Sequence, residues 1–526
     1  MKSVTLFLAV LVSLLLAQEW SVTYSSGPDI NDEAVAVAVD SYGNCYVLGR
    51  TQQATLVKYD PQGETLWTRT TPDSGWNYRD SMDLALDQQG NPVLAVAVYK
   101  GDSNAFHLAK YQSNGDAVWS TTYWHPQTGP HAVGPVLVGT TDEGDIYIAG
   151  CTGTDSTYED VITCRFLPTG AHRWTRVLDG PRHSYDRPGD LVVVDAGRIV
   201  VGAKTTDAAN DQNLSMLCYD STGVLLWDYY YMRDASYSSV ADGCDIGPDG
   251  SVYVAGWRSQ GTDTEIELLL VKLSPNGDSL WAAAESASDG LFKPSLVADT
   301  MGNVYVVATF ERHDTMAMKT WKFSPAGTKL WQRTCLENDS FPTMGHNAIL
   351  AADQGVYACG VHRTELWRWE YLVAKYRPNG NEAWRGFREG SRLFRDWLAA
   401  GAVDPDDNIV VTGWTDSAPT GRRDFLTTKF RATGGVAQSG RLPAPDDAIE
   451  VSPSVVAKGC EFRCSRPARL RIVNLTGRTV AELASSGETV RWDLAPPDGQ
   501  LVPNGVYFAV AEAPGFRAMV RFIVHR

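Results

Sequence analysis

The chain has 526 residues, of which 44% are hydrophobic and 21% are charged, so it can bury a core and is not a disordered segment. Its length exceeds that of one ordinary domain and predicts either several domains or one large repeat array. The net charge of −16 disfavours nucleic acid as a partner, because an acidic protein repels the phosphate backbone.

The N-terminus has the pattern of a secretory signal peptide. One Lys precedes an apolar run from Val4 to Leu16, and the small residue Ala17 follows it. The run is too short for a membrane anchor, and no later run is long enough to cross a membrane. We therefore expect residues 1–17 to be removed. The mature chain is then exported, without a transmembrane segment, and is either secreted or held at the cell surface.

Residues 18–438 contain one unit that recurs eight times. Each unit includes a Gly-containing turn that precedes a Trp, and successive Trp residues are separated by 50–55 residues. The seven copies that keep the Trp end at Trp67, Trp119, Trp174, Trp227, Trp281, Trp331 and Trp384, and Gln438 replaces the Trp in the eighth. A second turn, rich in Asp, Gly and Asn, lies between consecutive Trp residues.

Each unit has the pattern of four strands. In the first unit these are 34–40, 44–49, 55–60 and 64–70, with turn residues at the breaks. Eight such units predict an all-β fold, an eight-bladed β-propeller. The segment WSVTY at Trp20 is similar to WSTTY at Trp119, so we expect it to supply the missing fourth strand of the eighth blade. This N-terminal strand would close the ring and remove two open edges.

The units resemble the secreted bacterial β-propeller repeat, of the form D-x-x-G-N-x-Y-V-x-G followed by K-Y-x-P-x-G-x-x-x-W. The resemblance covers residues 20–438. It implies an exported binding or scaffolding protein and does not imply a particular chemistry.

After the repeats, a Pro- and Asp-rich linker over 439–450 leads to a last region, 451–526, with alternating strand patterns. Its size and a Trp expected to be buried, Trp492, suit a small Ig-like β-sandwich. The region resembles the C-terminal sorting domain of type IX secretion and the Ig-like domain of flagellar hook-capping proteins. The resembling residues are Asn474, Gly477, Arg478, Val480, Trp492, Asp493, Gly499, Asn504, Gly505, Val506 and Tyr507. The resemblance implies contact with secretion machinery, and a plain accessory module is the alternative.

The nine cysteines form no metal-type CxxC pair, and most are expected to be small buried hydrophobic residues. Cys151 and Cys164 are candidates to face each other across a hairpin. Cys460 and Cys464 can pair only if a turn lies between them, because four residues of strand span roughly 13 Å.

The repeated turns and Trp residues have structural interpretations. A calcium loop needs several oxygen ligands in close register, whereas most of these turns offer one Asp followed by Gly-Asn. We therefore predict that the Asp residues form Asx-turns, and we predict no metal site. The repeated Trp residues are expected to pack between neighbouring blades.

The connections between second and third strands, and between blades, are long and varied. In an up-and-down blade both sets emerge on one side, and we place a ligand-binding face there, for a glycan, a peptide or a surface protein. The candidate residues are Trp76, Tyr78, Trp124, His125, His131, His183, Tyr185, Trp367, Trp369 and Trp397, with His346 and Trp414 among further members of the same connections. Packing over the blade ends is the alternative role for these side chains. The spacing of the three His residues at 125, 131 and 183 fits no zinc motif.

No catalytic or cofactor motif is recognisable, so we favour an exported binding or scaffold protein over an enzyme and predict no catalytic residues and no cofactor. The alternative is a propeller-fold polysaccharide hydrolase or lyase. Carboxylates or His at the central mouth would favour the enzyme, whereas small apolar and backbone groups there would favour the binding protein.

Overall fold

A computed structural model describes residues 18–524 except for short gaps. The gaps are residues 28, 72–76, 101–102, 126–134, 154–158, 181–182, 184, 196, 207–211, 232–236, 261–265, 289, 313–314, 336–341, 365–367, 389–394, 417–421, 434–448, 453–454, 457–458, 465–466, 475–478, 487–488, 495–501 and 514–515. The chain divides into two compact units, Met1–Gly435 and Val436–Arg526. The described residues contain strands and no helix, and accordingly none of their elements is an apolar helix that could cross a membrane.

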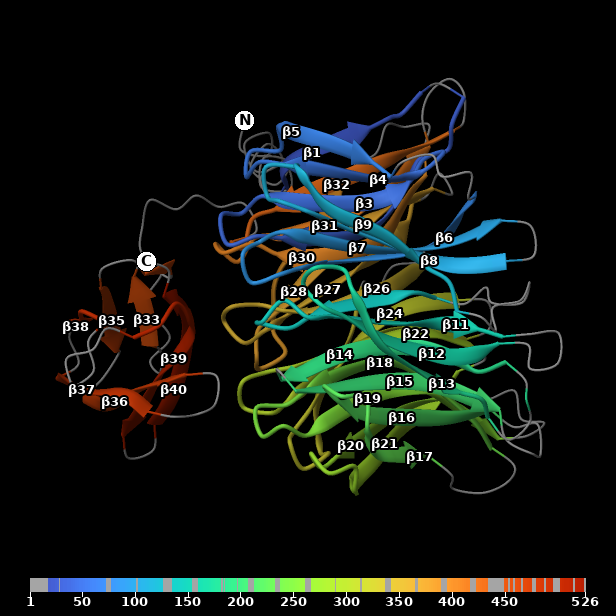
Figure 1. Cartoon of the computed structure of the whole chain (residues 1–526). Helices are drawn as coiled ribbons and strands as arrows, with labels where there is room; N and C mark the ends of the chain where they lie inside the picture. The colour runs from blue at the N-terminus through green and yellow to red at the C-terminus, as the bar shows by residue number, and fades with distance from the viewer. Residues whose placement is uncertain are drawn as a thin grey trace, which may run out of the picture. The chain divides into compact units, whose positions relative to one another are not determined.

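The described residues of the first unit form eight antiparallel four-stranded sheets, numbered here in chain order from β2 (Figure 1). Sheet 1 has β2 (Glu33–Val39), β3 (Cys45–Arg50), β4 (Ala54–Tyr59) and β5 (Thr65–Thr70). Sheet 2 has β6 (Asn77–Leu86), β7 (Pro92–Lys100), β8 (Ser103–Tyr111) and β9 (Ala117–Tyr123). Sheet 3 has β10 (Leu137–Thr140), β11 (Ile146–Thr152), β12 (Asp160–Phe166) and β13 (His172–Leu178). Sheet 4 has β14 (Arg187–Asp195), β15 (Arg198–Thr206), β16 (Gln212–Asp220) and β17 (Leu225–Tyr230).

The other four sheets repeat this order. Sheet 5 has β18 (Tyr237–Ile246), β19 (Val252–Gln260), β20 (Ile266–Leu273) and β21 (Ser279–Ser288). Sheet 6 has β22 (Gly290–Ala298), β23 (Val304–Arg312), β24 (Thr315–Phe323) and β25 (Lys329–Thr334). Sheet 7 has β26 (Thr343–Leu350), β27 (Val356–Arg363), β28 (Trp369–Tyr376) and β29 (Glu382–Arg388). Sheet 8 has β30 (Asp396–Val403), β31 (Ile409–Asp416), β32 (Arg423–Phe430) and β1 (Gln18–Tyr24).

The sheets follow one another around a ring. The first strand of each sheet, called here the inner strand, lies beside the first strand of the next, and β30 of sheet 8 lies beside β2 of sheet 1. Apolar side chains of adjacent sheets form shared cores, such as the one that joins sheets 1 and 2 through Tyr46, Leu56 and Leu94. This repeated all-β arrangement is consistent with a β-propeller, as the sequence predicts.

The N-terminal strand completes the last sheet. β1 pairs with β32 in antiparallel register from Gln18 opposite Phe430 to Tyr24 opposite Phe425. The expectation that the N-terminal strand supplies the missing fourth strand of the eighth unit is therefore confirmed. Backbone hydrogen bonds thus join the two ends of the repeat array. β1 covers the edge of β32 that the incomplete eighth unit would otherwise leave unpaired.

The repeated Trp residues join neighbouring sheets, as predicted. The indole N–H of Trp227 in sheet 4 donates to the carbonyl oxygen of Pro275 in sheet 5 at 3.1 Å. The same ring covers Gly277, whose φ of +88° suits glycine and whose added Cβ would lie 2.6 Å from the indole. The equivalent hydrogen bonds are Trp20 to Pro61, Trp67 to Ser113, Trp119 to Pro168, Trp174 to Ser221, Trp281 to Pro325, Trp331 to Pro378 and Trp384 to Ala432. We call this contact the indole–turn clasp. Trp20 of β1 supplies the eighth clasp.

The recurring Asp residues are structural, which agrees with the Asx-turn prediction. Asp40 Oδ1 accepts the backbone N–H groups of Tyr42 and Asn44, each at 2.9 Å. A buried Lys of the third strand balances the carboxylate, since Lys58 Nζ lies 3.7 Å from Asp40 and donates to the Ser113 carbonyl of the next sheet. Comparable pairs are Lys110 with Asp87, Lys272 with Asp249, Lys322 with Asp299 and Lys429 with Asp404.

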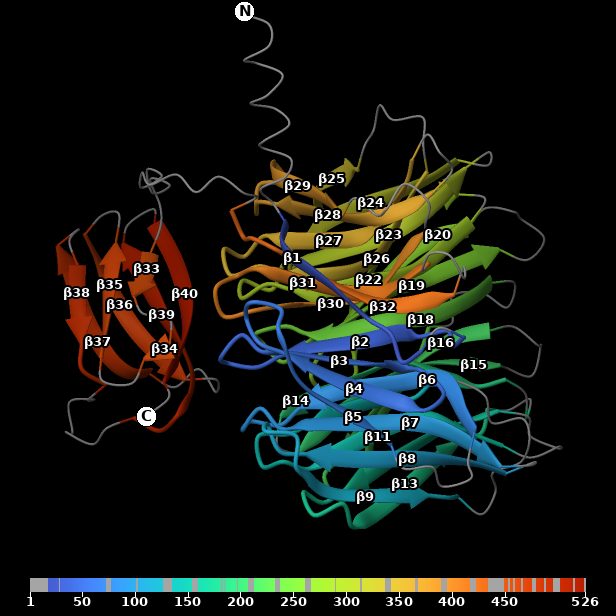
Figure 2. The same cartoon turned by 90° about the horizontal axis from the view of Figure 1, so that it is seen from above.

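In the second unit, the residues that the structure describes form two sheets (Figure 2). One contains β33 (Ile449–Ser452), β35 (Cys460–Cys464) and β38 (Thr489–Trp492). The other contains β34 (Val455–Val456), β40 (Phe516–Val524), β39 (Gly505–Ala513), β36 (Pro467–Asn474) and β37 (Thr479–Ser486). They share one core that includes Phe462, Leu470, Trp492 and Tyr507. Trp492 is buried, as expected from the sequence.

The structure corrects one cysteine hypothesis and decides another. Cys151 lies opposite Val161 and Cys164 lies opposite Ile148, so these thiols do not face each other across the hairpin, and no disulfide joins them. Cys460 and Cys464 are the two ends of the continuous strand β35. No turn separates them, and this extended spacing excludes a disulfide between them.

Candidate functional site

Seven of the eight inner strands have an irregular register partway along their length: β2, β6 and the five consecutive inner strands from β14 to β30 that border the site. In these five strands the irregularities lie between Pro188 and Asp190 in β14, Ala241 and Gly243 in β18, Phe292 and Ser295 in β22, Gly345 and Asn347 in β26, and Leu398 and Ala400 in β30. A β-bulge inserts unpaired residues and re-aims side chains. The bulges therefore turn residues away from the sheets.

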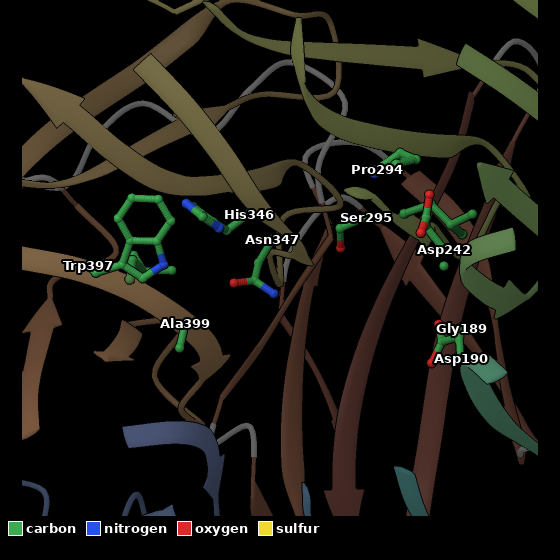
Figure 3. Close-up of a pocket in the computed structure, with 12 residues that line it drawn as sticks. Gly189, Asp190, Asp242, Pro294, Ser295, His346, Asn347, Trp397 and Ala399 are labelled. Atoms are coloured by element: carbon green, nitrogen blue, oxygen red, sulfur yellow. The ribbon is translucent and has the colours of Figure 1, made fainter. Parts of the chain in front are cut away.

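These bulged segments border a cavity of about 500 Å³. This volume is within the range of about 300–1,000 Å³ that is usual for small-molecule sites. The lining residues are Gly189, Asp190, Asp242, Gly243, Pro294, Ser295, Leu296, His346, Asn347, Trp397, Leu398 and Ala399. Figure 3 shows Trp397 and His346 on one side and Asp190 and Asp242 on the other, with Asn347 and Ser295 between them.

The aromatic side of the cavity is a cluster centred on Trp397. Its ring centroid lies 5.2 Å from that of His346 and 6.2 Å from that of Trp369, both in edge-on geometry. Trp414 stacks against it at 6.4 Å, and Arg423 lies over Trp414. These contacts fix the position of the Trp397 ring, so the cavity has a rigid aromatic side.

The polar side of the cavity takes part in bonds between sheets. Asp190 accepts the backbone N–H of Leu191 at 2.8 Å and that of Cys244, in the next sheet, at 2.7 Å. The Ser295 hydroxyl accepts the N–H of Ala348, again in the next sheet, at 3.1 Å. Asp190 and Ser295 therefore have two roles: they line the cavity and they hydrogen-bond one inner strand to the next.

Burial changes the protonation of these inner-strand carboxyls. Loss of solvation raises the pKa of Asp190 to about 7, although the N–H donors of Cys244 and Leu191 oppose the shift. Asp83 of β6 joins sheets 2 and 3 in the same way, through the N–H of Val138, and burial raises its pKa to about 6. The inner ring therefore contains carboxyls that titrate near neutral pH.

Of the binding residues predicted from sequence, the structure brings Trp369 and Trp397 together. Both lie in strands, β28 and β30, and not in the long connections. Trp124 and Tyr185 are exposed, with 56% and 44% of their surface accessible. His125 and His183 have different partners, Thr152 at 3.4 Å and Asp179 at 2.6 Å. Trp76, His131 and Trp367 lie outside the described residues, and for Tyr78 only the backbone, in β6, is described.

A group of three carboxyls beside His183 was not predicted. Oxygen atoms of Asp160, Asp179 and Asp186 lie within 4.8 Å of one another. Asp186 already accepts the N–H groups of Gly180 and Thr206, and burial raises its pKa to about 6. Asp160 begins β12, whereas Asp179 and Asp186 lie in the connection between β13 and β14, and no sequence motif links the three. The backbone hydrogen bonds of Asp186 give this residue a structural role in holding the connection between β13 and β14 in place.

Comparisons with known proteins identify no family. No family model matches the chain, and no curated protein matches it. A solved polysaccharide lyase is 10% identical, with 79% of this chain and 100% of that chain covered and a TM-score of 0.45. An ulvan lyase is 10% identical, with 66% and 90% covered and a TM-score of 0.41. PorZ, a surface component of the type IX secretion system of Porphyromonas gingivalis, is 11% identical, with 94% and 81% covered and a TM-score of 0.26. These values carry no argument about activity.

We expect the free energy of unfolding to fall between about pH 4 and pH 8, because the inner carboxyls lose their protons over this range. A raised pKa means that folded Asp190 binds its proton more tightly than the unfolded chain does. Its stabilising contribution is complete below the ordinary pKa of about 4 and is lost as the pH rises through about 7. Asp190→Asn should therefore flatten the fall of the melting temperature across this range.

The matched control for this measurement is Asp220→Asn. Asp220 ends β16 next to an exposed turn, where hydrogen bonds led by the Thr222 side chain lower its pKa, so it titrates below the range. The control should keep the slope of the native protein. If Asp190→Asn does not change the slope of melting temperature against pH, the raised pKa of Asp190 is not a source of the pH dependence.

Proposed function

We propose that this protein is an exported binding protein, an eight-bladed β-propeller that holds a ligand in its central cavity. The cavity of about 500 Å³, with the fixed Trp397 ring on one side and polar groups on the other, is the observation that carries the proposal. A preformed site on a rigid ring needs little ordering when the ligand binds. The long connections remain the proposed surface for larger partners.

A glycan is the ligand class that this combination favours. Aromatic rings pack against the C–H faces of sugars, and amide, hydroxyl and carboxyl groups pair with sugar hydroxyls. A peptide or a surface protein is the other ligand class. Location outside the cell is supported by the signal-peptide pattern of residues 1–17 and by the resemblance of the repeats to secreted propeller repeats.

A polysaccharide hydrolase or lyase is the second candidate function. His346, Asp190 and Asp242 line the same cavity, and such groups are those expected of the enzyme. However, both oxygens of Asp190 accept backbone N–H groups, which limits this carboxyl as a general base. Incubation with neutral and acidic polysaccharides separates the two functions. New reducing ends would support the enzyme, and their absence with retained binding would support the binding protein.

We expect the full mature chain to bind a subset of an array of glycans, and Trp397→Ala to weaken that binding at least about tenfold. Trp124→Ala is the contrasting variant, because Trp124 is an exposed aromatic residue that does not line the cavity. Loss of binding in Trp124→Ala alone would place the ligand on the long connections. Absence of binding to every glycan would contradict the glycan proposal.

We further propose that the second unit directs secretion or attachment. The proposal rests on its resemblance to sorting domains and on its separate core. In a host with type IX secretion, a chain that lacks residues 451–526 should accumulate in the periplasm with the strand content of the first unit intact. Surface delivery that the truncation leaves unchanged would contradict this role.

A further inference from the structure

Two polar groups in the cavity retain hydrogen-bonding capacity that the described residues do not use. The Oδ1 atom of Asn347 is buried and accepts no hydrogen bond from any described residue. The Ser295 oxygen accepts the N–H of Ala348, and within the described part of the chain its own proton has no acceptor. Both side chains line the cavity, and Figure 3 shows them between the Trp397 side and the Asp242 side.

A buried acceptor without a partner carries a free-energy cost, which a ligand in the cavity removes. Asn347 Oδ1 needs a donor, and the Ser295 hydroxyl can donate to an acceptor. A ligand hydroxyl can do both, whereas a carboxylate cannot donate and an ammonium group cannot accept. The unused capacity therefore matches a ligand that bears several hydroxyl groups.

The charge of the lining limits the ligand further. Asp190 and Asp242 line the cavity, and among its described lining residues there is no Lys or Arg. An anionic ligand would have to lose its hydration next to two carboxyl groups without a cation to balance it. A uronate is therefore disfavoured relative to the corresponding neutral sugar.

We propose that the cavity binds a neutral sugar ring through Asn347 and Ser295, with a C–H face of the ring against Trp397, and that it discriminates against uronates. The inference rests on the proposed function, because it assigns the ligand class of the same cavity. A free sugar and the terminal residue of a glycan chain present the same chemistry, and the test separates them by comparing each sugar with its methyl glycoside.

The test uses the full mature chain and three matched pairs: glucose with glucuronate, galactose with galacturonate, and mannose with mannuronate. The members of each pair differ only at C6. Saturation-transfer NMR and titration should detect binding of at least one neutral sugar, with its uronate bound at least about tenfold more weakly. Retained binding of the methyl glycoside would indicate a chain end, and its loss a free sugar.

Asn347→Leu, which keeps the approximate shape and removes both polar atoms, should weaken binding of the neutral sugar at least about tenfold. Asn114→Leu is the control. It makes the same substitution in an exposed turn, far from the lining residues in sequence, and it should leave sugar binding unchanged. If Asn347→Leu does not fold, the ratio between neutral sugar and uronate in the native protein still decides the proposal.

Three results would overturn the inference. A uronate that binds as tightly as its neutral partner would refute the ligand class while leaving a binding protein in place. Binding that Asn347→Leu leaves unchanged would move the site elsewhere. If no sugar of the panel binds at millimolar concentration, the neutral-sugar inference is rejected. Binding of the protein to the glycan array would then leave the proposed glycan-binding function in place, whereas absence of binding to the array would reject that function as well.

Discussion

The indole–turn clasp is the contact on which the ring depends. In a repeat ring each sheet contacts only its two neighbours, so the stability of the whole is close to a sum of sheet and interface contributions. Every interface has one Trp that donates to a turn carbonyl of the next sheet, and Trp20 extends the series to the interface between sheets 8 and 1. The weakest interface is therefore the place where the ring would open first.

The clasp also explains why the turns are so uniform. In seven of the eight clasps the structure describes the glycine under the indole, and its φ is positive in each; a Cβ at Gly63 would lie 2.8 Å from Trp20. The indole therefore restricts which residue can occupy the turn, since a side chain at the glycine would overlap the ring. At the axis, Asp83, Asp190 and Ser295 connect neighbouring inner strands. The cavity depends on both sets of contacts, because they set the distance between the bulged strands.

The sequence predicts most of the fold and only part of the site. Alternating apolar residues and a repeated turn predict the strands of sheet 1, β2 to β5, to within about one residue, and the similarity of the segments at Trp20 and Trp119 predicts the closing strand. The site residues Asn347, Ser295 and Asp242 gave no signal, because bulges shift the register of the inner strands and no local pattern shows which residues they turn toward the axis. The sequence pattern indicates Trp397 but places it in a connection, whereas it lies in β30, because the inner strand begins one residue earlier, at Asp396.

The most direct test of the central claim is a double-mutant cycle on one clasp, with the free energy of unfolding measured by urea denaturation. Trp227→Ala should cost about 2–3 kcal/mol, less than for a fully buried Trp, because the indole is half-buried. At Gly277 an added Cβ meets both an unfavourable φ and the overlapping indole. At Gly250 the φ is similar, +77°, but the nearest atom to an added Cβ lies at 3.5 Å, which is ordinary contact. The account predicts that Gly277→Ala costs clearly more than Gly250→Ala in the native background, and that this excess disappears in the Trp227→Ala background. Equal costs of Gly277→Ala in both backgrounds would show that the indole does not hold the turn and would contradict the account.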